Sequence, residues 1–107
     1  MGLEDVGQTL EQLWISYNAI DRLDGLQPCI KLRILFMSNN KIKSWDEVSK
    51  LAQLPEIQNV LLVGNIIYGK DNQEESWPMV IKRVPQLTTL DDVTVTAEVR
   101  SKAETMD

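Results

Sequence analysis

Few residues of this chain could take part in chemistry. Its 107 residues include no histidine and one cysteine, Cys29. Without histidine the chain lacks the commonest acid–base catalyst and a common metal ligand, and a lone thiol without a basic partner is a poor nucleophile. Two carboxylate pairs, Glu74–Glu75 and Asp91–Asp92, are adjacent in sequence and are expected to be solvated loop charges. We therefore expect no enzymatic activity, no metal site and no cofactor.

The charge of the chain disfavours several classes of partner. The formal net charge is −5, whereas nucleic acids and anionic membranes are bound by basic surfaces. Short basic stretches at 31–33 and 41–43 remain candidates for steering an acidic partner. The single cysteine indicates a reducing compartment. No apolar run reaches the roughly 18 residues that span a bilayer, and no signal-peptide pattern is visible. We expect a soluble cytoplasmic protein with one domain over residues 1–107.

An eleven-residue phrase is repeated three times along the chain. The copies occupy residues 10–20, 32–42 and 57–67, so they begin 22 and 25 residues apart. Each has apolar residues at positions 1, 4, 6 and 11 and asparagine at position 9. This is the leucine-rich-repeat signature, and it predicts an α/β solenoid with a parallel sheet on one face and helices or turns on the other. We place the repeats near 10–31, 32–56 and 57–86, and a C-terminal helical cap at 87–107.

The apolar positions of the phrase define the expected strands. Positions 4 and 6 alternate with variable residues, which is the period of a strand. The core side chains are then Leu13, Ile15, Leu35, Met37, Val60 and Leu62. Stacked copies of such a strand would pair about 4.8 Å apart. Asn18, Asn40 and Asn65 follow the strands where the chain turns back, and we expect their amides to form a ladder that satisfies the turn backbone.

The segments that return to the next strand are expected to be short helices and turns. Residues 21–31 have room for only a short turn of helix. Ser44 and Glu47 form a capping box that begins a helix over 45–53, with Val48, Leu51 and Ala52 facing inward.

The later return segments carry the remaining helices. A polar loop at 69–75 precedes a helix near 76–84, in which Pro78 occupies the tolerated first turn. A charged helix over 96–105 is the expected terminal cap. Trp45 and Trp77 lie at the starts of helices, and we expect them to pack against the convex side.

The residues that alternate with the core positions must face the other, concave side of the sheet. They are Gln12, Trp14, Ser16, Ile34, Phe36, Ser38, Asn59, Leu61 and Val63. Repeat packing does not require the large apolar column Trp14–Phe36–Leu61, and exposed apolar patches commonly mark binding sites. We predict a partner-binding surface there. Two alternatives stay open, namely that another contact covers Trp14, or that the aromatics only stabilise neighbouring strands.

The N-terminal end of the chain shows no cap. Leu3, Val6 and Leu10 have the pattern of the tail of an earlier repeat, so we expect a piece of a longer solenoid. The first strand, near 12–16, would be an open edge that pairs readily with another chain. We therefore predict self-association through this strand.

The strand phrases resemble one family closely. The runs TLEQLWISYN (9–18), LRILFMSNNKI (32–42) and KRVPQLTTLD (82–91) are similar to the axonemal dynein light chain 1 family, the leucine-rich-repeat subunits of the outer dynein arm. So is the helix that carries Trp45. The resemblance covers nearly the whole chain but only the C-terminal half of that family.

The resemblance implies a non-catalytic subunit of a ciliary or flagellar motor. Such a subunit would bind a dynein heavy chain near its microtubule-binding end through the sheet face, lie in the axoneme and help regulate motility, with tubulin as a further partner. In the terminal helix Arg100 matches the family's contact residues, whereas Val93 and Thr96 differ. Ile66 and Asp92 also depart from the family pattern, where proline and glycine are usual.

The sequence is compatible with three other kinds of protein. Repeats of 22 residues also resemble the regulator of protein phosphatase 1 and, with less support because the chain is acidic, the spliceosomal leucine-rich-repeat scaffold. A truncated product without a role of its own is the third.

Overall fold

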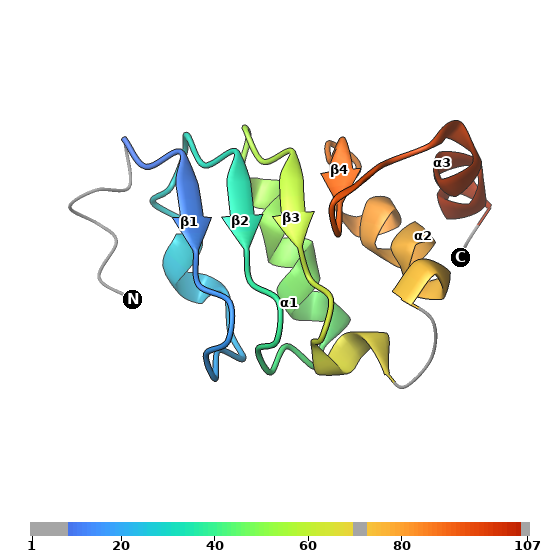
Figure 1. Ribbon diagram of the computed structural model, residues 1–107. Coiled ribbons are helices and arrows are strands. Elements are labelled where there is room, and N and C mark those ends of the chain that lie inside the picture. Colours follow the sequence, from blue (N-terminus) through green and yellow to red (C-terminus); the bar gives the residue numbers. More distant parts are fainter. Residues whose placement is uncertain (1–8, 70–72, 106–107) are drawn as a thin grey trace.

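The parallel sheet predicted from the repeats is present. A computed structural model describes residues 9–69 and 73–105, and within these ranges five strands form one sheet in chain order (Figure 1). The strands are β1 (Gln12–Trp14), β2 (Ile34–Phe36), β3 (Asn59–Leu61), β4 (Thr89–Leu90) and β5 (Val93–Thr94). The first four are parallel, and β5 pairs with β4 in the antiparallel sense.

The register of the sheet follows the phrase position by position. Leu13 lies opposite Leu35, which lies opposite Val60, so position 4 of each copy forms one row. Because side chains alternate between the two faces of a strand, a common register sends equivalent positions to the same face. In the second and third copies, positions 1, 4, 6 and 11 lie in the core. Seven of these eight residues are buried, namely Leu32, Leu35, Met37, Ile42, Ile57, Val60 and Leu62. The eighth, Ile67, is partly buried.

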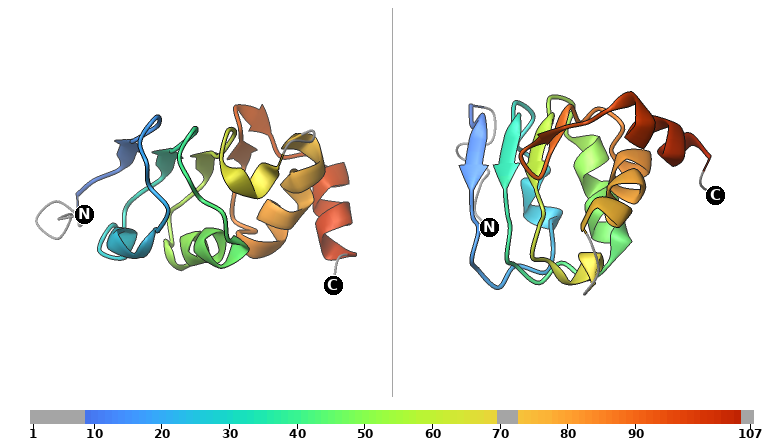
Figure 2. Two further views of the ribbon diagram at one scale, coloured as in Figure 1. Left: turned by 90° about the horizontal axis from the view of Figure 1, so that it is seen from below. Right: turned by 45° about the vertical axis from the view of Figure 1, so that its right-hand side comes forward.

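Short 3₁₀ turns and helices cover the side of the sheet that carries the core. They are η1 (Asp24–Leu26), α1 (Trp45–Ser49), η2 (Lys50–Gln53), η3 (Ile66–Tyr68), α2 (Gln73–Arg83) and α3 (Ala97–Glu104). Figure 2 (left) shows the strands along one side of the molecule and the helices along the other. None of the helices in the described ranges is long and apolar enough to cross a membrane.

The helix expected over 45–53 is only half α-helical. Its last four residues wind as the 3₁₀ turn η2, in which residues three apart share a face. Val48 and Leu51 are therefore buried as predicted, whereas Ala52 is exposed and its predicted inward position was wrong.

The predicted capping box is also incomplete. The Ser44 hydroxyl accepts a hydrogen bond from the Asp46 N–H at 3.1 Å. Glu47, however, does not close the box: its Oε1 accepts from the backbone N–H of Leu23 in the preceding repeat at 2.8 Å. The Glu47 carboxylate thus joins two repeats. The capping-box spacing predicts only a local contact of Glu47 and gives no sign of this longer-range one.

The third return segment begins its helix earlier than expected. Helix α2 starts at Gln73, so the predicted loop is wrong from that residue onward, and residues 70–72 lie outside the described part. Pro78 consequently lies inside the helix instead of in its first turn.

The two ends of the solenoid differ. Helix α3 packs on α2, with Ala103 and Leu87 buried, as expected of a terminal cap. At the other end the core positions of the first copy, Leu10, Leu13, Ile15 and Ile20, are only partly buried. Their full burial in the second copy shows that each repeat is normally covered on both sides. The predicted earlier-repeat residues Leu3 and Val6 lie outside the described part.

The residue at position 8 of each phrase turns the chain with a left-handed backbone. The φ angles are 62° at Tyr17, 57° at Asn39 and 87° at Gly64. Glycine adopts this region without strain. At Gly64 it also makes room, because a Cβ there would lie 2.3 Å from the Asn39 side-chain oxygen.

Candidate binding surface on the sheet

The sheet face is defined here by the outward side chains of β1, β2 and β3, whose middle column is Trp14, Phe36 and Leu61. These three residues are directly opposite one another in the register. The rings of Trp14 and Phe36 are 5.4 Å apart between centroids and tilted by 33°, a distance typical of a stabilising aromatic pair. Trp14 is nevertheless 69% exposed. The predicted apolar column is therefore continuous, with Trp14 exposed and Phe36 and Leu61 half-buried, and its role in binding stays a prediction.

The residues beside this column are more polar. Ile34 and Asn59 are half-buried, and Gln12 is exposed. The side-chain oxygen of Asn59 is occluded and has no hydrogen-bond partner among the described residues. Buried polar atoms usually have a hydrogen-bond partner, so this oxygen could accept a hydrogen bond from a group other than the described residues.

The residues at position 7 of the phrase, two residues beyond the end of each strand, differ in exposure. Ser38 is only 4% exposed, and its backbone N–H and hydroxyl lie 3.0 and 2.9 Å from the Ser16 hydroxyl oxygen. Val63 is partly buried against the core. The burial of Ser38 makes the expectation that it presents its side chain to a partner wrong. Ser16 is half-buried, and its hydroxyl also contacts the next repeat. The binding roles of Ser16 and Val63 stay predictions.

The three phrase asparagines form the predicted ladder, with the first member incomplete. The Asn40 amide donates to the carbonyl of Ile15 in the preceding repeat at 3.1 Å and to its own Met37 at 2.9 Å. Its oxygen accepts from the N–H groups of Asn18 and Ile20.

The third copy repeats this pattern. The Asn65 amide donates to the carbonyls of Met37 and Leu62, and its oxygen accepts from the Ile42 N–H at 3.1 Å. Asn18 is exposed and donates only within its own repeat, to Ile15 and Ser16. The ladder is a structural device, because its donors and acceptors are used in joining repeats.

Asp91 is a buried carboxylate whose role the sequence did not reveal. Its Oδ1 accepts from the backbone N–H groups of Leu62 and Val63 at 2.7 and 3.0 Å. Its Oδ2 accepts from the Tyr68 hydroxyl at 2.7 Å and from the Trp77 indole at 2.8 Å. The expectation of a solvated charge holds for the exposed Asp92 and is wrong for Asp91. Leu87 and Leu90 have the spacing of positions 1 and 4 of the phrase. The position of Asp91 directly after Leu90, which pairs with Val60 of β3, was the signal that could have revealed this role.

This carboxylate fixes the packing of the third return segment. Burial, followed by the negative charge and hydrogen bond of Asp91, raises the pKa of Tyr68 well above its usual range, so its hydroxyl remains a donor. Trp77 is held by the same oxygen and packs against the core, as predicted. Trp45 also packs against the core, with the Arg83 guanidinium 5.2 Å from its ring centroid.

Arg100 has a structural role that was not anticipated. Its guanidinium donates to the carbonyls of Pro85 at 2.9 Å and Leu87 at 2.7 Å. These two bonds attach α3 to the segment that leads into β4. The partner contact expected of Arg100 from the family resemblance stays a prediction, and it would compete with this attachment.

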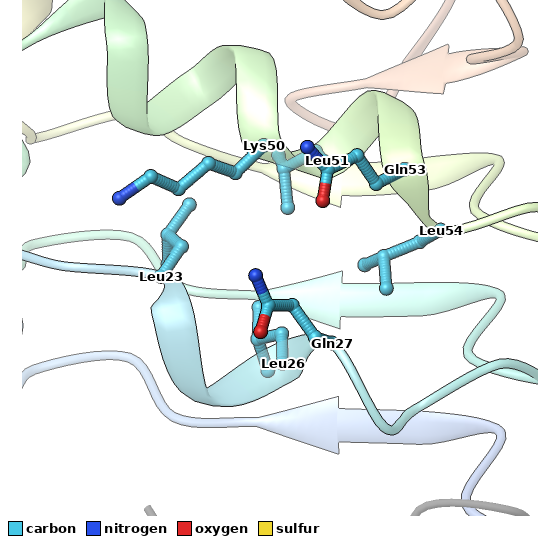
Figure 3. A pocket seen from close by; sticks show the side chains of 7 residues that line it. All are labelled: Leu23, Leu26, Gln27, Lys50, Leu51, Gln53 and Leu54. Carbon is cyan, nitrogen blue, oxygen red and sulfur yellow. The ribbon is translucent and has the colours of Figure 1, made fainter.

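A second polar cluster lies between η1 and η2. Lys50 Nζ lies 2.6 Å from Asp24 Oδ1 and 2.8 Å from Glu47 Oε2. The Lys50 hydrogen bond lowers the pKa of both carboxyl groups, and the two carboxylates raise the pKa of Lys50. Next to it is a cavity of about 80 Å³ lined mainly by leucines (Figure 3). Small-molecule sites usually measure about 300–1,000 Å³, so this cavity fits no metabolite.

The described ranges contain neither a cluster of metal ligands nor an accessible thiol. Residues 9–69 and 73–105 contain no group of three or more acidic or cysteine side chains that could hold a metal. Cys29 is buried, and burial raises the pKa of its thiol, which disfavours the reactive thiolate.

Comparison with known proteins assigns this fold to a class. The family model for leucine-rich repeats in two copies matches residues 8–59. A solved Drosophila melanogaster SNF/U2A′ complex contains a chain of the same fold, with a TM-score of 0.75 at 22% identity, over 89% of this chain and 54% of that one. The protein is a leucine-rich-repeat solenoid.

Within that class the chain is similar to axonemal dynein light chain 1 proteins. It is 45% identical over 105 residues to that protein from Chlamydomonas reinhardtii, which covers 94% of this chain and 53% of the relative. It is 50% identical over 95 residues to the Homo sapiens protein, covering 88% and 50%. The chain thus spans about half the length of these curated relatives.

Proposed function

We propose that the chain is a non-catalytic subunit that binds an axonemal dynein heavy chain through its sheet face. The observation that carries the proposal is an exposed Trp14 packed on Phe36 in a chain similar to axonemal dynein light chain 1. Tryptophan is among the residues most enriched in the energetic centres of interfaces. A net charge of −5 supports a protein partner over nucleic acid or membrane.

The proposal extends to place and role. Contact near the microtubule-binding end of the heavy chain would locate the chain in the ciliary or flagellar axoneme, part of the cytoskeleton, next to tubulin. There it would influence motility by altering how the motor holds the microtubule. The column, in which the half-buried Phe36 and Leu61 continue the exposed Trp14, supplies an apolar surface that an amphipathic element of the heavy chain could cover.

The test is direct binding. The full chain, immobilised, is expected to retain a recombinant stalk fragment of an outer-arm heavy chain and to recover that heavy chain from axonemal extract. Retention of the fragment with a dissociation constant in the micromolar range or tighter would support the proposal. Failure of both experiments, or specific recovery of protein phosphatase 1 or a ribonucleoprotein in place of dynein, would contradict it.

Self-association through β1 forms a second part of the proposal. The edge of β1 away from β2 has no partner strand among the described residues, and Leu10 and Leu13 beside it are partly exposed. The strand residues Gln12–Trp14 include no lysine or proline of the kind that protects edges. Sedimentation is expected to show a dimer that grows with concentration, and a Leu13→Lys variant is expected to weaken it. A single monomer boundary up to high concentration would refute this part.

A further inference from the structure

Tyr17 occupies a backbone conformation that suits other residues better. Its φ of 62° is left-handed, a region that costs bulky side chains energy because Cβ crowds the following carbonyl. The equivalent residues of the next two repeats are Asn39 and Gly64, which tolerate that region well. The fold itself therefore gives no reason for tyrosine at this position.

The side chain of Tyr17 is not used within the described chain. It is 80% exposed, more than any other large hydrophobic residue of the described ranges. Its backbone N–H donates to the Ser38 carbonyl at 3.0 Å and so fixes the turn. No hydrogen bond involves its hydroxyl among residues 9–69 and 73–105. Strained, exposed residues that the structure does not use are often retained for function.

Tyr17 lies close to the proposed binding surface. It lies in the turn three residues beyond Trp14, the last residue of β1, so their Cα atoms are at most about 10 Å apart. A protein interface of ordinary size covers about 800 Å² on each side, which is wide enough to include both aromatic side chains.

We propose that Tyr17 extends the sheet face as a second aromatic anchor for the same partner. The proposal rests on the proposed function and specifies the chemistry of the occupant. A segment that covers Trp14 must also bury the Tyr17 ring and offer its hydroxyl an acceptor, such as a backbone carbonyl or a carboxylate, because a buried tyrosine hydroxyl needs a partner. In the complex, contact with the heavy chain then offsets the backbone strain at Tyr17.

The experiment compares stability and affinity in the same variants. Tyr17→Asn, which copies the residue of the second repeat, is expected to raise the midpoint of chemical denaturation because it relieves the turn. The same variant is expected to bind the heavy-chain stalk fragment about tenfold more weakly. Tyr17→Phe should lose affinity while leaving the denaturation midpoint nearly unchanged. Ile30→Ala, at another exposed apolar residue away from the sheet, is the control and should bind as the unaltered chain does.

The outcomes separate this inference from the proposed function. Unchanged affinity of Tyr17→Asn, when the unaltered chain binds, overturns the inference alone. A denaturation midpoint that falls in Tyr17→Asn shows that tyrosine serves the fold and also overturns it. If the unaltered chain binds no stalk fragment, the proposed function fails, and this inference fails with it.

Discussion

Replacement of Asp91 by alanine is expected to lower the free energy of unfolding by about 3–5 kcal/mol, because several buried donors lose their acceptor. The substitution removes the acceptor of four donors, two of them the backbone N–H groups of Leu62 and Val63. Each buried donor left without a partner costs about 1–3 kcal/mol, and water that enters the space would recover part of that loss. The Tyr68 hydroxyl and the Trp77 indole lose their common acceptor at the same time. Guanidinium denaturation followed by tryptophan fluorescence measures the change.

The neighbouring Asp92 provides a matched control. Asp92 is exposed, and its backbone is left-handed like that of Asp91, with φ of 66° against 54°. Asp92→Asn keeps a residue that tolerates this conformation and removes one charge, so a change within about 0.5 kcal/mol is expected. A loss below 1 kcal/mol in Asp91→Ala would show that the carboxylate does not organise the third return segment. Asp91→Asn should fall between the two, since its amide oxygen can still accept from the backbone.

Replacement of Trp14 by alanine is expected to weaken heavy-chain binding by about 2–4 kcal/mol, the range of an energetic centre in an interface. This corresponds to roughly 30- to 1,000-fold in the dissociation constant. Because Trp14 is 69% exposed, its removal should cost little beyond the aromatic contact with Phe36, about 0.5–1.5 kcal/mol of stability. Titration of the labelled stalk fragment measures affinity, and circular dichroism confirms folding.

The result also decides between binding and the alternative that aromatics only join the strands. In that alternative Trp14→Ala unfolds the first repeat and leaves affinity unchanged whenever the chain is folded. Ile66→Ala is a suitable comparison because Ile66 is an exposed apolar residue outside the sheet, in η3. Equal affinity of the two variants would argue against the sheet face as the binding surface.

The sheet and its core could be predicted because a strand has a strict period of two. Once Leu13, Leu35 and Val60 occupy equivalent positions, parallel stacking leaves only one register that buries all of them. The same logic predicted the outward column of Trp14 and Phe36, which the structure confirms as adjacent. Local patterns were sufficient here because each strand residue of a repeat pairs with its counterpart in the next one.

The errors arose where contacts depend on residues far apart in the chain or on a change of backbone geometry. Asp91 meets Tyr68 and Trp77, which are 23 and 14 residues away, and adjacent carboxylates give no local sign of such a site. Strand alternation predicts Ser38 on the surface only if it continues two residues beyond the end of β2 at Phe36, where Ser38 is in fact buried. Ala52 was placed inside because a 3.6-residue period was assumed where the chain has three residues per turn.

The asparagine ladder and Asp91 together determine how this architecture can grow. Asn40 and Asn65 make equivalent bonds to the phrase before them, at positions 6 and 11 in each case. Insertion of a further whole unit before Asn65 would therefore reproduce these asparagine bonds at its new boundary. Asp91 allows no such copying, because its hydroxyl and indole donors lie in a single return segment. The segment from Asn65 to Asp91 must accordingly stay intact for its bonds to form, whereas the repeats before it form a modular stack.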